Sequence, residues 1–387
     1  MTRTAWTLSD VERDEHVDSL HITAGEVGAA GDFSIRKRTL RGGLREGVEV
    51  VEVDNGLLRF TVVPTRGMGL WRVELGDLRV GWLSPVLGPV HPQFVPVAEP
   101  SGIGWLAGFD ELLCRCGLES NGAPQFGDDG RLQYPLHGRI ANLPAQRVEA
   151  AIDTAAHAIA VEGTVDEARL FGHKLRLHTT YLTQLDQPRL RIVDRVTNLS
   201  SEPSNMELLY HINFGPPLAT PGARIVAPIE TLAPRDMHSA TDVARWSTLG
   251  PATAGLPEYA HFAELVADGE GRTRVMLVAA DGQRGVSLQF NRHRLPAFTI
   301  WKSQRLPEDG YVTGLEPGTN YPNVKRFEQQ QGRVPQLDPG QTLHFEIDLE
   351  VHPTAESVNA AAVDIANIAR GVEPTIRHEP MPGWSDV

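Results

Sequence analysis

The sequence predicts an all-β protein built as a large antiparallel β-sandwich with a few peripheral helices. Three observations support this class. Apolar and polar residues alternate with period two over many short segments, turn-forming residues separate those segments, and helical periodicity is scarce. Each such strand must bury one face, so many strands in succession are best accommodated by two or more packed antiparallel sheets.

The individual strands follow from local patterns taken in chain order. Residues 48–64 predict a hairpin that turns at Asp54-Asn55-Gly56, because Asn-Gly tolerates the positive φ angles of a tight turn. Residues 174–198 predict a hairpin with Asp-Gln-Pro at the bend, and residues 275–290 predict one around Asp-Gly. In residues 343–351 (LHFEIDLEV), the Leu, Phe, Ile and Val positions share one face, which we expect to be core.

The two ends of the chain depart from this alternation. Residues 1–28 are polar and mixed, and we expect a helix followed by a loop there. Residues 354–371 predict an amphipathic helix that packs outside the sheets, with Thr354 capping its start and Gly371 its end. The expected division is an N-terminal extension (1–40), a β-sandwich domain (41–353) and a C-terminal helix and tail (354–387).

Composition excludes several classes of function. The formal net charge is −13 and no basic block occurs, which argues against nucleic-acid binding. The two cysteines, Cys114 and Cys116, are separated by one residue, a poor spacing for an ordinary disulfide. No apolar signal segment begins the chain and no stretch of about 18 apolar residues occurs in it. We therefore expect a cytoplasmic protein without membrane insertion, and the exposed strand edges of such a fold allow a homodimer.

Three polar positions lie where a predicted strand passes into irregular backbone. His137 precedes Gly138 in YPLHGRIANLP, and His211 lies at the end of an apolar strand in MELLYHINFGPP. Glu316 lies between Gly314 and Pro317 in GYVTGLEPGTNYPN. Two histidines and one carboxylate form a usable set for acid/base chemistry.

The order and wording of these motifs resemble the aldose 1-epimerase (galactose mutarotase-like) superfamily. LHG at 136–138, VTNLSSEPSNMELLYHINF at 196–214 and GLEPGTNYPN at 314–323 occur in that family's order, and the resemblance spans residues 45–352. It implies a galactose mutarotase-like supersandwich. It also implies an isomerase that interconverts the anomers of a free sugar or sugar derivative, without a metal or redox cofactor because only protons move.

The resemblance also implies roles for the three residues. Glu316 would be the general base that removes the proton from the anomeric hydroxyl, and His211 the general acid that protonates the ring oxygen. His137 would hydrogen-bond the sugar or its ring oxygen and stabilise charge as the ring opens. A carboxylate of ordinary pKa is a weak base, so partial burial would favour the role of Glu316.

The chain departs from the family pattern at two points. Tyr210 precedes His211, where an Asn is usual, and the usual Trp-Asp pair is missing. Asp236 in APRDMHS is the nearest substitute for the sugar-binding acid. Residues 62–76 and 108–124 look like an uncharacterised side branch of the superfamily, which leaves the substrate open.

Further candidates for substrate contact lie near these motifs. Trp301 suits stacking on a sugar face, although a tryptophan on a strand is as often core. Lys302 follows it on the same predicted strand and would point to the opposite face, so at most one of the two would line the pocket. Arg66 would orient a hydroxyl or carboxylate of the ligand, or else bridge two sheet edges. Asn121 and Cys116 complete the candidates.

Other chemistries find less support in the sequence. The remaining histidines match no compact metal-ligand spacing, and no glycine-rich phosphate loop opens a helix. Arg66, Arg115 and Lys302 are too few basic residues to argue for a phosphorylated sugar. Two alternatives stay open: an isomerase or lyase acting on an oxidised or modified sugar, and a non-catalytic carbohydrate-binding protein. A matched acid and base speak against pure binding.

Overall fold

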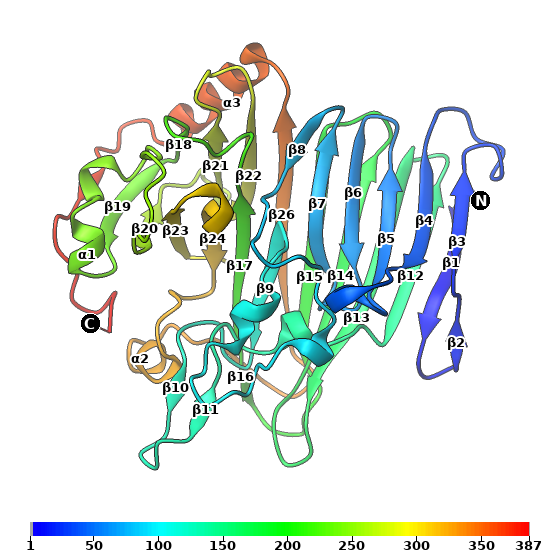
Figure 1. Ribbon diagram of the computed structural model, residues 1–387, viewed down its shortest axis with the longest axis horizontal. Helices are drawn as coiled ribbons and strands as arrows, with labels where there is room; N and C mark the ends of the chain where they lie inside the picture. The colour runs from blue at the N-terminus through cyan, green and yellow to red at the C-terminus, as the bar shows by residue number, and fades with distance from the viewer. Residues whose placement is uncertain (1–2, 387) are drawn as a thin grey trace.

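Two large β-sheets dominate the computed structural model, which describes residues 3–386 (Figure 1). The ten-stranded sheet runs in the order β18 (Arg224–Val226), β21 (Arg272–Val278), β22 (Gly285–Asn291), β26 (Thr342–His352), β15 (Arg189–Asn198), β14 (Lys174–Gln184), β13 (Ala158–Ala168), β12 (Arg147–Asp153), β1 (Arg3–Asp10) and β2 (Glu15–His16). The thirteen-stranded sheet runs in the order β27 (Thr375–Ile376), β19 (Ile229–Pro234), β20 (Tyr259–Leu265), β23 (Ala297–Gln304), β24 (Tyr311–Gly318), β17 (Glu207–Phe214), β9 (Leu113–Leu118), β7 (Gly69–Leu75), β6 (Leu58–Val63), β5 (Glu49–Asp54), β4 (Ser34–Thr39) and β3 (Leu20–Thr23), with β8 (Leu78–Val80) paired to β7. The predicted antiparallel β-sandwich is confirmed.

The smaller elements lie at the periphery. Two short ribbons pair β10 (Gln125–Phe126) with β11 (Leu132–Tyr134), and β16 (Ser204–Asn205) with β25 (Gln336–Leu337). The α-helices are α1 (Met237–Ala240), α2 (Lys325–Gln330) and α3 (Ala355–Ile368). Short 3-10 turns occur at Gly43–Arg45, Pro92–Phe94, Gly104–Gly108, Ile140–Asn142, Val243–Arg245 and Pro307–Asp309. None of the helices in the described part of the chain has the length and apolar character needed to span a bilayer.

The expected hairpins occur where the turn residues place them. β5 and β6 pair across Asp54-Asn55-Gly56, where Gly56 has a φ of 97°. β14 and β15 pair across the Asp-Gln-Pro bend, and β21 and β22 pair across Asp281-Gly282. β26 buries the side chains of Phe345 and Ile347, while the intervening Glu346 is exposed. Local turn chemistry and alternation therefore account for these strands.

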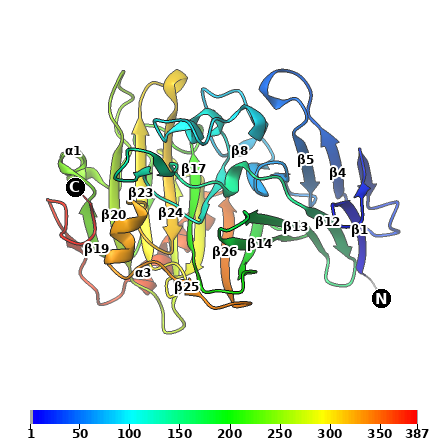
Figure 2. The same ribbon diagram turned by 90° about the horizontal axis from the view of Figure 1, so that it is seen from below.

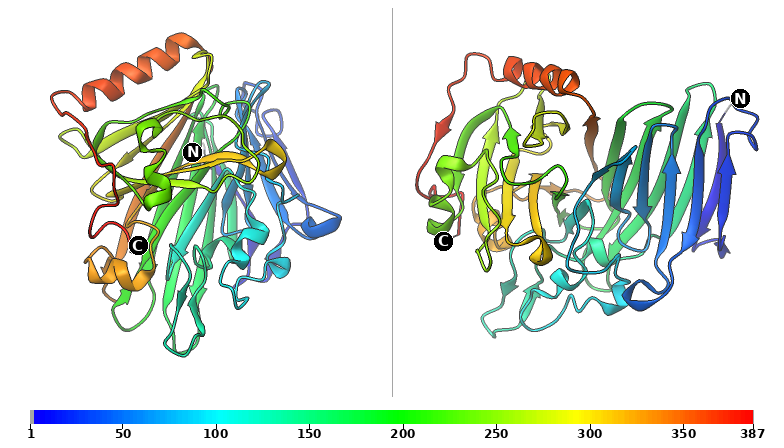
Figure 3. Two further views of the ribbon diagram at one scale, coloured as in Figure 1. Left: turned by 60° about the vertical axis from the view of Figure 1, so that its left-hand side comes forward. Right: turned by 45° about the horizontal axis from the view of Figure 1, so that its top comes forward.

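The main core lies between the two sheets, which stack as layers with β4 and β5 over β12 to β14 (Figure 2). Phe60 of the larger sheet contacts Tyr181 of the smaller one, with ring centroids 6.4 Å apart, and both side chains are buried. Burial of a side chain of this size contributes about 1.5–3 kcal/mol. The predicted C-terminal helix is confirmed as α3, which begins at the Thr354 cap and packs outside the sheets against Met276 of β21 (Figure 3). Its predicted end is wrong, because the helix stops at Ile368 with Ala369 as its C-cap instead of Gly371.

The expectation for the N-terminal residues is wrong in its secondary structure. Residues 3–10 form β1, which pairs with β12, and Leu8 is fully buried in the core. Residues 20–23 and 34–39 form β3 and β4 of the other sheet, so the segment expected as an extension (1–40) contributes strands to both sheets. β1, β3 and β4 have eight, four and six residues and lie at or near sheet edges, where exposure of many side chains allows a mixed composition that hides the alternation. The termini lie at opposite ends of the long axis (Figure 1).

The larger sheet has a second covered face, which points away from the sandwich core. β17 and β24 are buried along their whole length on both faces. Leu208, Tyr210 and Ile212 of β17 belong to the core between the sheets, and Leu209 packs in a separate cluster on the opposite face. This opposite face carries the polar residues described next.

Candidate active site

His211 and Glu316 meet on the outer face of the larger sheet. β17 and β24 are antiparallel neighbours with Ile212 opposite Leu315 and Asn213 opposite Gly314, so His211 faces Glu316 across the strand pair. The Nε2 atom of His211 lies 3.3 Å from the Oε1 atom of Glu316, and the two side chains are only 5% and 2% exposed. A proton can therefore pass directly between them or to a small molecule held beside them.

Gly314 allows the carboxylate to occupy this position. The side chain of Glu316 folds back along its own strand over Gly314. A β-carbon at 314 would lie closer than 3.0 Å to Oε1, and 3.1 Å from Cδ. The backbone of residue 314 is ordinary strand, so the glycine is required for the close approach of the carboxylate and not for its own φ.

His137 approaches the same point from a loop. Its φ is 58°, Gly138 has a φ of 73°, and a β-carbon at 138 would collide with the carbonyl oxygens of Ser120 and Gly117. This tight turn places the His137 ring 5.3 Å from the His211 ring, centroid to centroid. The Nδ1 atom of His137 lies 2.9 Å from the carbonyl oxygen of Asn121, and a carbonyl only accepts, so Nδ1 carries the proton of the neutral ring.

Aromatic rings enclose the two histidines. Trp105 lies 4.6 Å from the ring of His137, and Phe109 lies 4.9 Å from the ring of His211. Trp301 lies 5.3 Å from the ring of His211 on another side and is partly exposed. Trp105 and Phe109 were missed from the sequence, although two aromatic residues in the glycine-rich GIGWLAGFD segment are a usable signal. Together these rings exclude water from the acid/base pair.

Burial sets the protonation of the site. Desolvation raises the pKa of the Glu316 carboxyl well above its usual range, and the nearby carboxylate of Glu258 adds to this effect. Desolvation lowers the pKa of His211 well below that of an ordinary histidine, and the neighbouring His137 lowers it further. Burial also lowers the pKa of His137, against its hydrogen bond to Asn121. Burial therefore disfavours the charged form of each side chain, the carboxylate of Glu316 and the imidazolium of His211.

Several buried polar atoms in the site have no hydrogen-bond partner within residues 3–386. They are the hydroxyl of Thr299 and the indole N–H of Trp105, while the Oε1 atom of Glu316 has no hydrogen bond in this part of the chain beyond its 3.3 Å approach to Nε2 of His211. Thr299 lies directly opposite Glu316 in the strand pair of β23 and β24. Buried polar groups are nearly always hydrogen-bonded to protein or to ordered water, so these atoms are available to hydrogen-bond a small polar molecule beside Glu316.

Trp301 and Lys302 point to opposite faces of β23. Trp301 reaches the site, and its indole N–H donates to Glu258 at 2.7 Å. Lys302 is fully buried on the other face, where it forms an ion pair with Asp242 and donates to the carbonyl oxygen of Arg245 at 2.9 Å. Lys302 therefore lies outside the site.

Arg66 also lies outside the reach of a ligand. Its guanidinium is fully buried and is occupied by an ion pair with Glu111 and by hydrogen bonds to Asn142 at 2.8 Å and to the carbonyl oxygen of Gly108 at 2.9 Å. Glu111 in turn accepts hydrogen bonds through its backbone oxygen from Asn213 and Trp82, both at 3.1 Å. Arg66 thus holds Glu111, whose backbone oxygen accepts from the side chain of Asn213 beside His211.

Asp236 does not contact His211 or Glu316 in the described part of the chain and is linked to the site through Arg235. It caps α1 by accepting a hydrogen bond from the backbone N–H of Ser239 at 2.7 Å, and it pairs with Arg235 at 2.9 Å. Arg235 also pairs with Glu258 at 3.3 Å, the residue that holds Trp301. Asp236 therefore connects to the site only through this chain of contacts.

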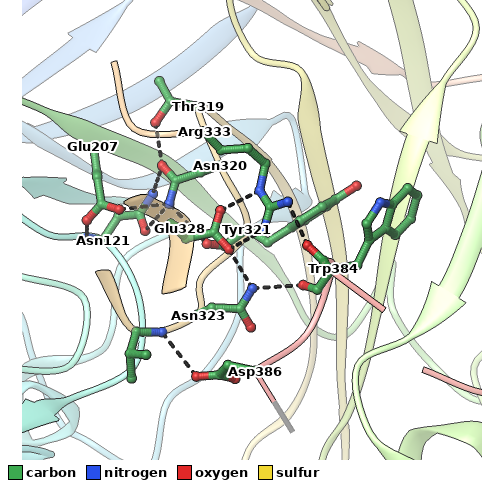
Figure 4. Close-up of polar contacts among 12 residues, drawn as sticks. Asn121, Glu207, Thr319, Asn320, Tyr321, Asn323, Glu328, Arg333, Trp384 and Asp386 are labelled. Atoms are coloured by element: carbon green, nitrogen blue, oxygen red, sulfur yellow. Dashed lines mark hydrogen bonds and ion pairs between the residues drawn. The ribbon is translucent and has the colours of Figure 1, made fainter. Parts of the chain in front are cut away.

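Asn121 lies behind the site in a polar network (Figure 4). Its side chain pairs with Asn320, and its backbone N–H donates to the buried Glu207 at 3.2 Å. Asn320 follows Glu316 by four residues, so the network connects the segment after Glu316 to the loop that holds His137. Asn121 therefore supports His137 through its backbone. Cys114 lies directly opposite His211 in the pair of β9 and β17, and Cys116 lies two residues further on the same face, where both are buried in the cluster that contains Trp105 and Phe109.

Two other polar features lie away from these residues. A groove of about 860 Å³ lies on the outer face of the ten-stranded sheet. Its charged side chains pair with one another, as Arg3 does with Glu162 at 3.0 Å, and it lacks the aromatic walls of the His211 site. Among residues 3–386, one group of three metal-type ligands lies within 4.8 Å: Glu119, Glu167 and His173. Both ring nitrogens of His173 already face these carboxylates at 3.0 Å.

Comparison with known proteins identifies relatives of the whole chain. The family model described as Domain of unknown function (DUF4432) matches residues 45–351. The crystal structure of a "putative aldose 1-epimerase" from Klebsiella pneumoniae is 32% identical, with a TM-score of 0.95, and the match covers 98% of this chain and 99% of that one. No curated protein matches the sequence.

More distant structures share the fold. A galactose 1-epimerase from Lactobacillus acidophilus is 12% identical with a TM-score of 0.53, covering 86% of this chain and 98% of that one. A "putative aldose 1-epimerase" from Escherichia coli K12 is 14% identical with a TM-score of 0.51, covering 79% and 99%. These likenesses confirm the predicted galactose mutarotase-like sandwich.

Proposed function

The chain belongs to the DUF4432 family, a divergent branch of the galactose mutarotase-like proteins, and we propose that it is an aldose 1-epimerase-like isomerase acting on a free sugar or sugar derivative. The observation that carries this proposal is the pairing of Glu316 and His211 at 3.3 Å in a water-excluding aromatic site. Opening a cyclic sugar requires one proton to leave the anomeric hydroxyl as another reaches the ring oxygen. The hydroxyl oxygen and the ring oxygen are both bonded to the anomeric carbon. A base and an acid that lie side by side can therefore reach the two oxygens at the same time.

One shared proton is enough for the whole cycle. With the closed ring bound, the reactive form has the Glu316 carboxylate beside protonated His211. Glu316 takes the proton of the anomeric hydroxyl while His211 gives its proton to the ring oxygen, the bond from C1 to the ring oxygen breaks, and C1 becomes an aldehyde. This leaves Glu316 protonated and His211 neutral. Rotation about the bond between C1 and C2 and reversal of both transfers close the ring with the other anomeric configuration.

The burial of Glu316 and His211 favours the stage of this cycle at which the sugar ring is open. Desolvation disfavours the ion pair of Glu316 and His211 and favours the form in which both are neutral, which is the form that accompanies the open sugar. The enzyme thus stabilises the state that follows ring opening relative to the state that precedes it. His137, whose Nε2 carries no proton in the neutral ring, accepts a hydrogen bond from a sugar hydroxyl in this proposal.

The surroundings suit a neutral sugar. Trp301, which is partly exposed, offers an apolar ring beside His211, and the hydroxyl of Thr299, which has no hydrogen-bond partner among residues 3–386, can bind a sugar hydroxyl. The nearest cations are already paired: Arg235 with Asp236 and Glu258, and Arg66 with Glu111. A phosphate or carboxylate on the substrate would find no unpaired cation among these groups.

The test is the exchange of magnetisation between the two anomeric proton signals of free aldoses and uronic acids, followed by NMR. We expect acceleration by the wild-type protein for a neutral aldose, and a loss of roughly 10²- to 10⁴-fold in the Glu316→Gln variant with sugar binding retained. Glu202→Gln, at an exposed position, is the matched control and should retain the wild-type rate.

Two results would count against the proposal. If folded wild-type protein accelerates exchange for no sugar, mutarotation is wrong, and an isomerase or lyase acting on a modified sugar, or a binding role, becomes the better explanation. If Glu316→Gln retains the wild-type rate, the carboxylate is not the base.

A further inference from the structure

Asn213 is fully buried beside His211 and shares its face of β17. Two residues along a strand point the same way, and the Oδ1 atom of Asn213 lies 2.6 Å from the Nδ1 atom of His211. Asn213 is not among the residues predicted from the sequence to form the site. Its position in YHINF, two residues after a histidine on a predicted strand, was the available signal.

The orientation of the Asn213 amide is fixed by its other contacts. The Nδ2 atom lies 3.1 Å from the backbone oxygen of Glu111 and 3.0 Å from that of His211. Carbonyl oxygens only accept hydrogen bonds, so the NH₂ group must face them and the amide oxygen must face the imidazole. The backbone is fixed as well, because the N–H of Asn213 donates to the backbone oxygen of Leu112 at 2.6 Å.

This orientation determines which nitrogen of His211 carries the proton. An amide oxygen accepts only, so the Nδ1 atom of His211 must be the donor. In the neutral ring Nε2 is then without a hydrogen, and its lone pair faces Oε1 of Glu316 at 3.3 Å. With the opposite tautomer, Nε2–H would face the protonated Glu316, and neither could pass a proton to the other.

We propose that Asn213 is a positioning residue that holds the Nδ1–H tautomer of His211, so that Nε2 exchanges the single shared proton with Glu316 and the substrate. The kinetic part of this proposal rests on the proposed mutarotation, whereas the tautomer itself can be observed without any turnover. Catalytic histidines are commonly oriented by a group on the second ring nitrogen, and here that group is uncharged.

The neutrality of the amide has a functional consequence. A carboxylate at position 213 would also accept from Nδ1, but its negative charge would stabilise the imidazolium of His211. The ring would then retain the proton that must return to Glu316 when the sugar opens. An amide orients the ring without adding this charge, which matches a cycle that passes through two neutral side chains.

The first experiment is ¹⁵N NMR of the imidazole nitrogens at neutral pH, with the His211 signals assigned by their loss in His211→Gln. We expect the wild-type spectrum to show Nδ1 protonated and Nε2 unprotonated. A wild-type spectrum with Nε2 protonated in the neutral ring would overturn the proposal, and this measurement requires no variant at 213 and no activity.

Two variants provide the second experiment. In Asn213→Ala we expect a mixture of tautomers and a kcat lower by about 10- to 100-fold, with KM changed little. In Asn213→Asp we expect the Nδ1–H tautomer to persist while the acid limb of the pH–rate profile moves to higher pH. The control is Asn291→Ala, a strand asparagine bonded to Glu270 and His293.

The outcomes separate the two proposals. If no sugar is turned over but His211 shows Nδ1–H in wild type and mixed tautomers in Asn213→Ala, the positioning role stands and the mutarotase function fails. If both variants fold and neither the tautomer nor the pH profile changes, Asn213 is merely structural.

Discussion

Replacing Gly314 by alanine should inactivate the protein while leaving its fold intact. The new methyl group would lie closer than 3.0 Å to Oε1 of Glu316, and ordinary contact at 3.4 Å or more requires the carboxylate to move by about 1 Å. Such a displacement from the position beside His211 is expected to lower kcat by about 100-fold. The backbone at 314 is ordinary strand, so the free energy of unfolding should change by no more than about 1 kcal/mol.

The assay combines anomeric exchange by NMR with thermal unfolding. Gly269→Ala is the matched control, because residue 269 lies in a loop where an added β-carbon meets nothing within 4 Å. A double-mutant cycle with Glu316→Asp adds a second test. The shorter acid withdraws from the new methyl group, so the effects of Gly314→Ala and Glu316→Asp should not add.

The reasoning would be refuted by a Gly314→Ala variant that is as active as wild type, since the carboxylate would then have no need of its present position. A second contrary result is a large fall in the unfolding temperature together with the loss of activity. In that case the methyl group disturbs the strand pairing of β24 rather than the carboxylate of Glu316.

Two further predictions concern pH and the buried lysine. The pH–rate profile should have a broad plateau across neutral pH. The acid limb should lie well below pH 6.5, because burial lowers the pKa of His211 and protonation of this ring on top of a protonated Glu316 leaves no base. The alkaline limb should report the raised pKa of Glu316. An acid limb at or above pH 6.5 in a titration of kcat/KM would contradict this assignment. Lys302→Met should lower the free energy of unfolding by about 3 kcal/mol, because it removes the buried cation beside Asp242 and leaves that carboxylate only His261 and the exposed Arg245, yet KM should stay near wild type. A raised KM in folded Lys302→Met, measured beside Trp301→Leu, would return Lys302 to the site.

The sequence predicts the parts of this molecule that depend on neighbours along the chain. Alternation and turn residues define the hairpin of β5 and β6, and the cap at Thr354 defines the start of α3. By contrast, the approach of His211 to Glu316 depends on pairing between strands about 100 residues apart, which no local pattern encodes and only the family resemblance suggested.

Partner choice among buried charges was also beyond the sequence. Arg66 and Lys302 have the chemistry of ligand-binding residues, and their acidic partners, Glu111 and Asp242, lie far away in the sequence. A buried Arg or Lys needs an acceptor or an anion beside it, and either a ligand or a carboxylate of the protein can fill that place. Tertiary packing decides which of the two it contacts. Trp105 was missed for a related reason, because a loop residue becomes a site wall only when the loop folds over the sheet.

The departure from the family pattern at Tyr210 has a geometric explanation. Successive residues of a strand point to opposite faces, so Tyr210 cannot lie on the same face as His211. Its hydroxyl instead donates to Asp194 at 2.8 Å in the sandwich core, where Asp194 also pairs with the buried Arg115. The amide that contacts His211 comes from Asn213, two residues further along and on the correct face. The unusual residue before the histidine therefore lies in the core and does not enter the contact between His211 and Glu316.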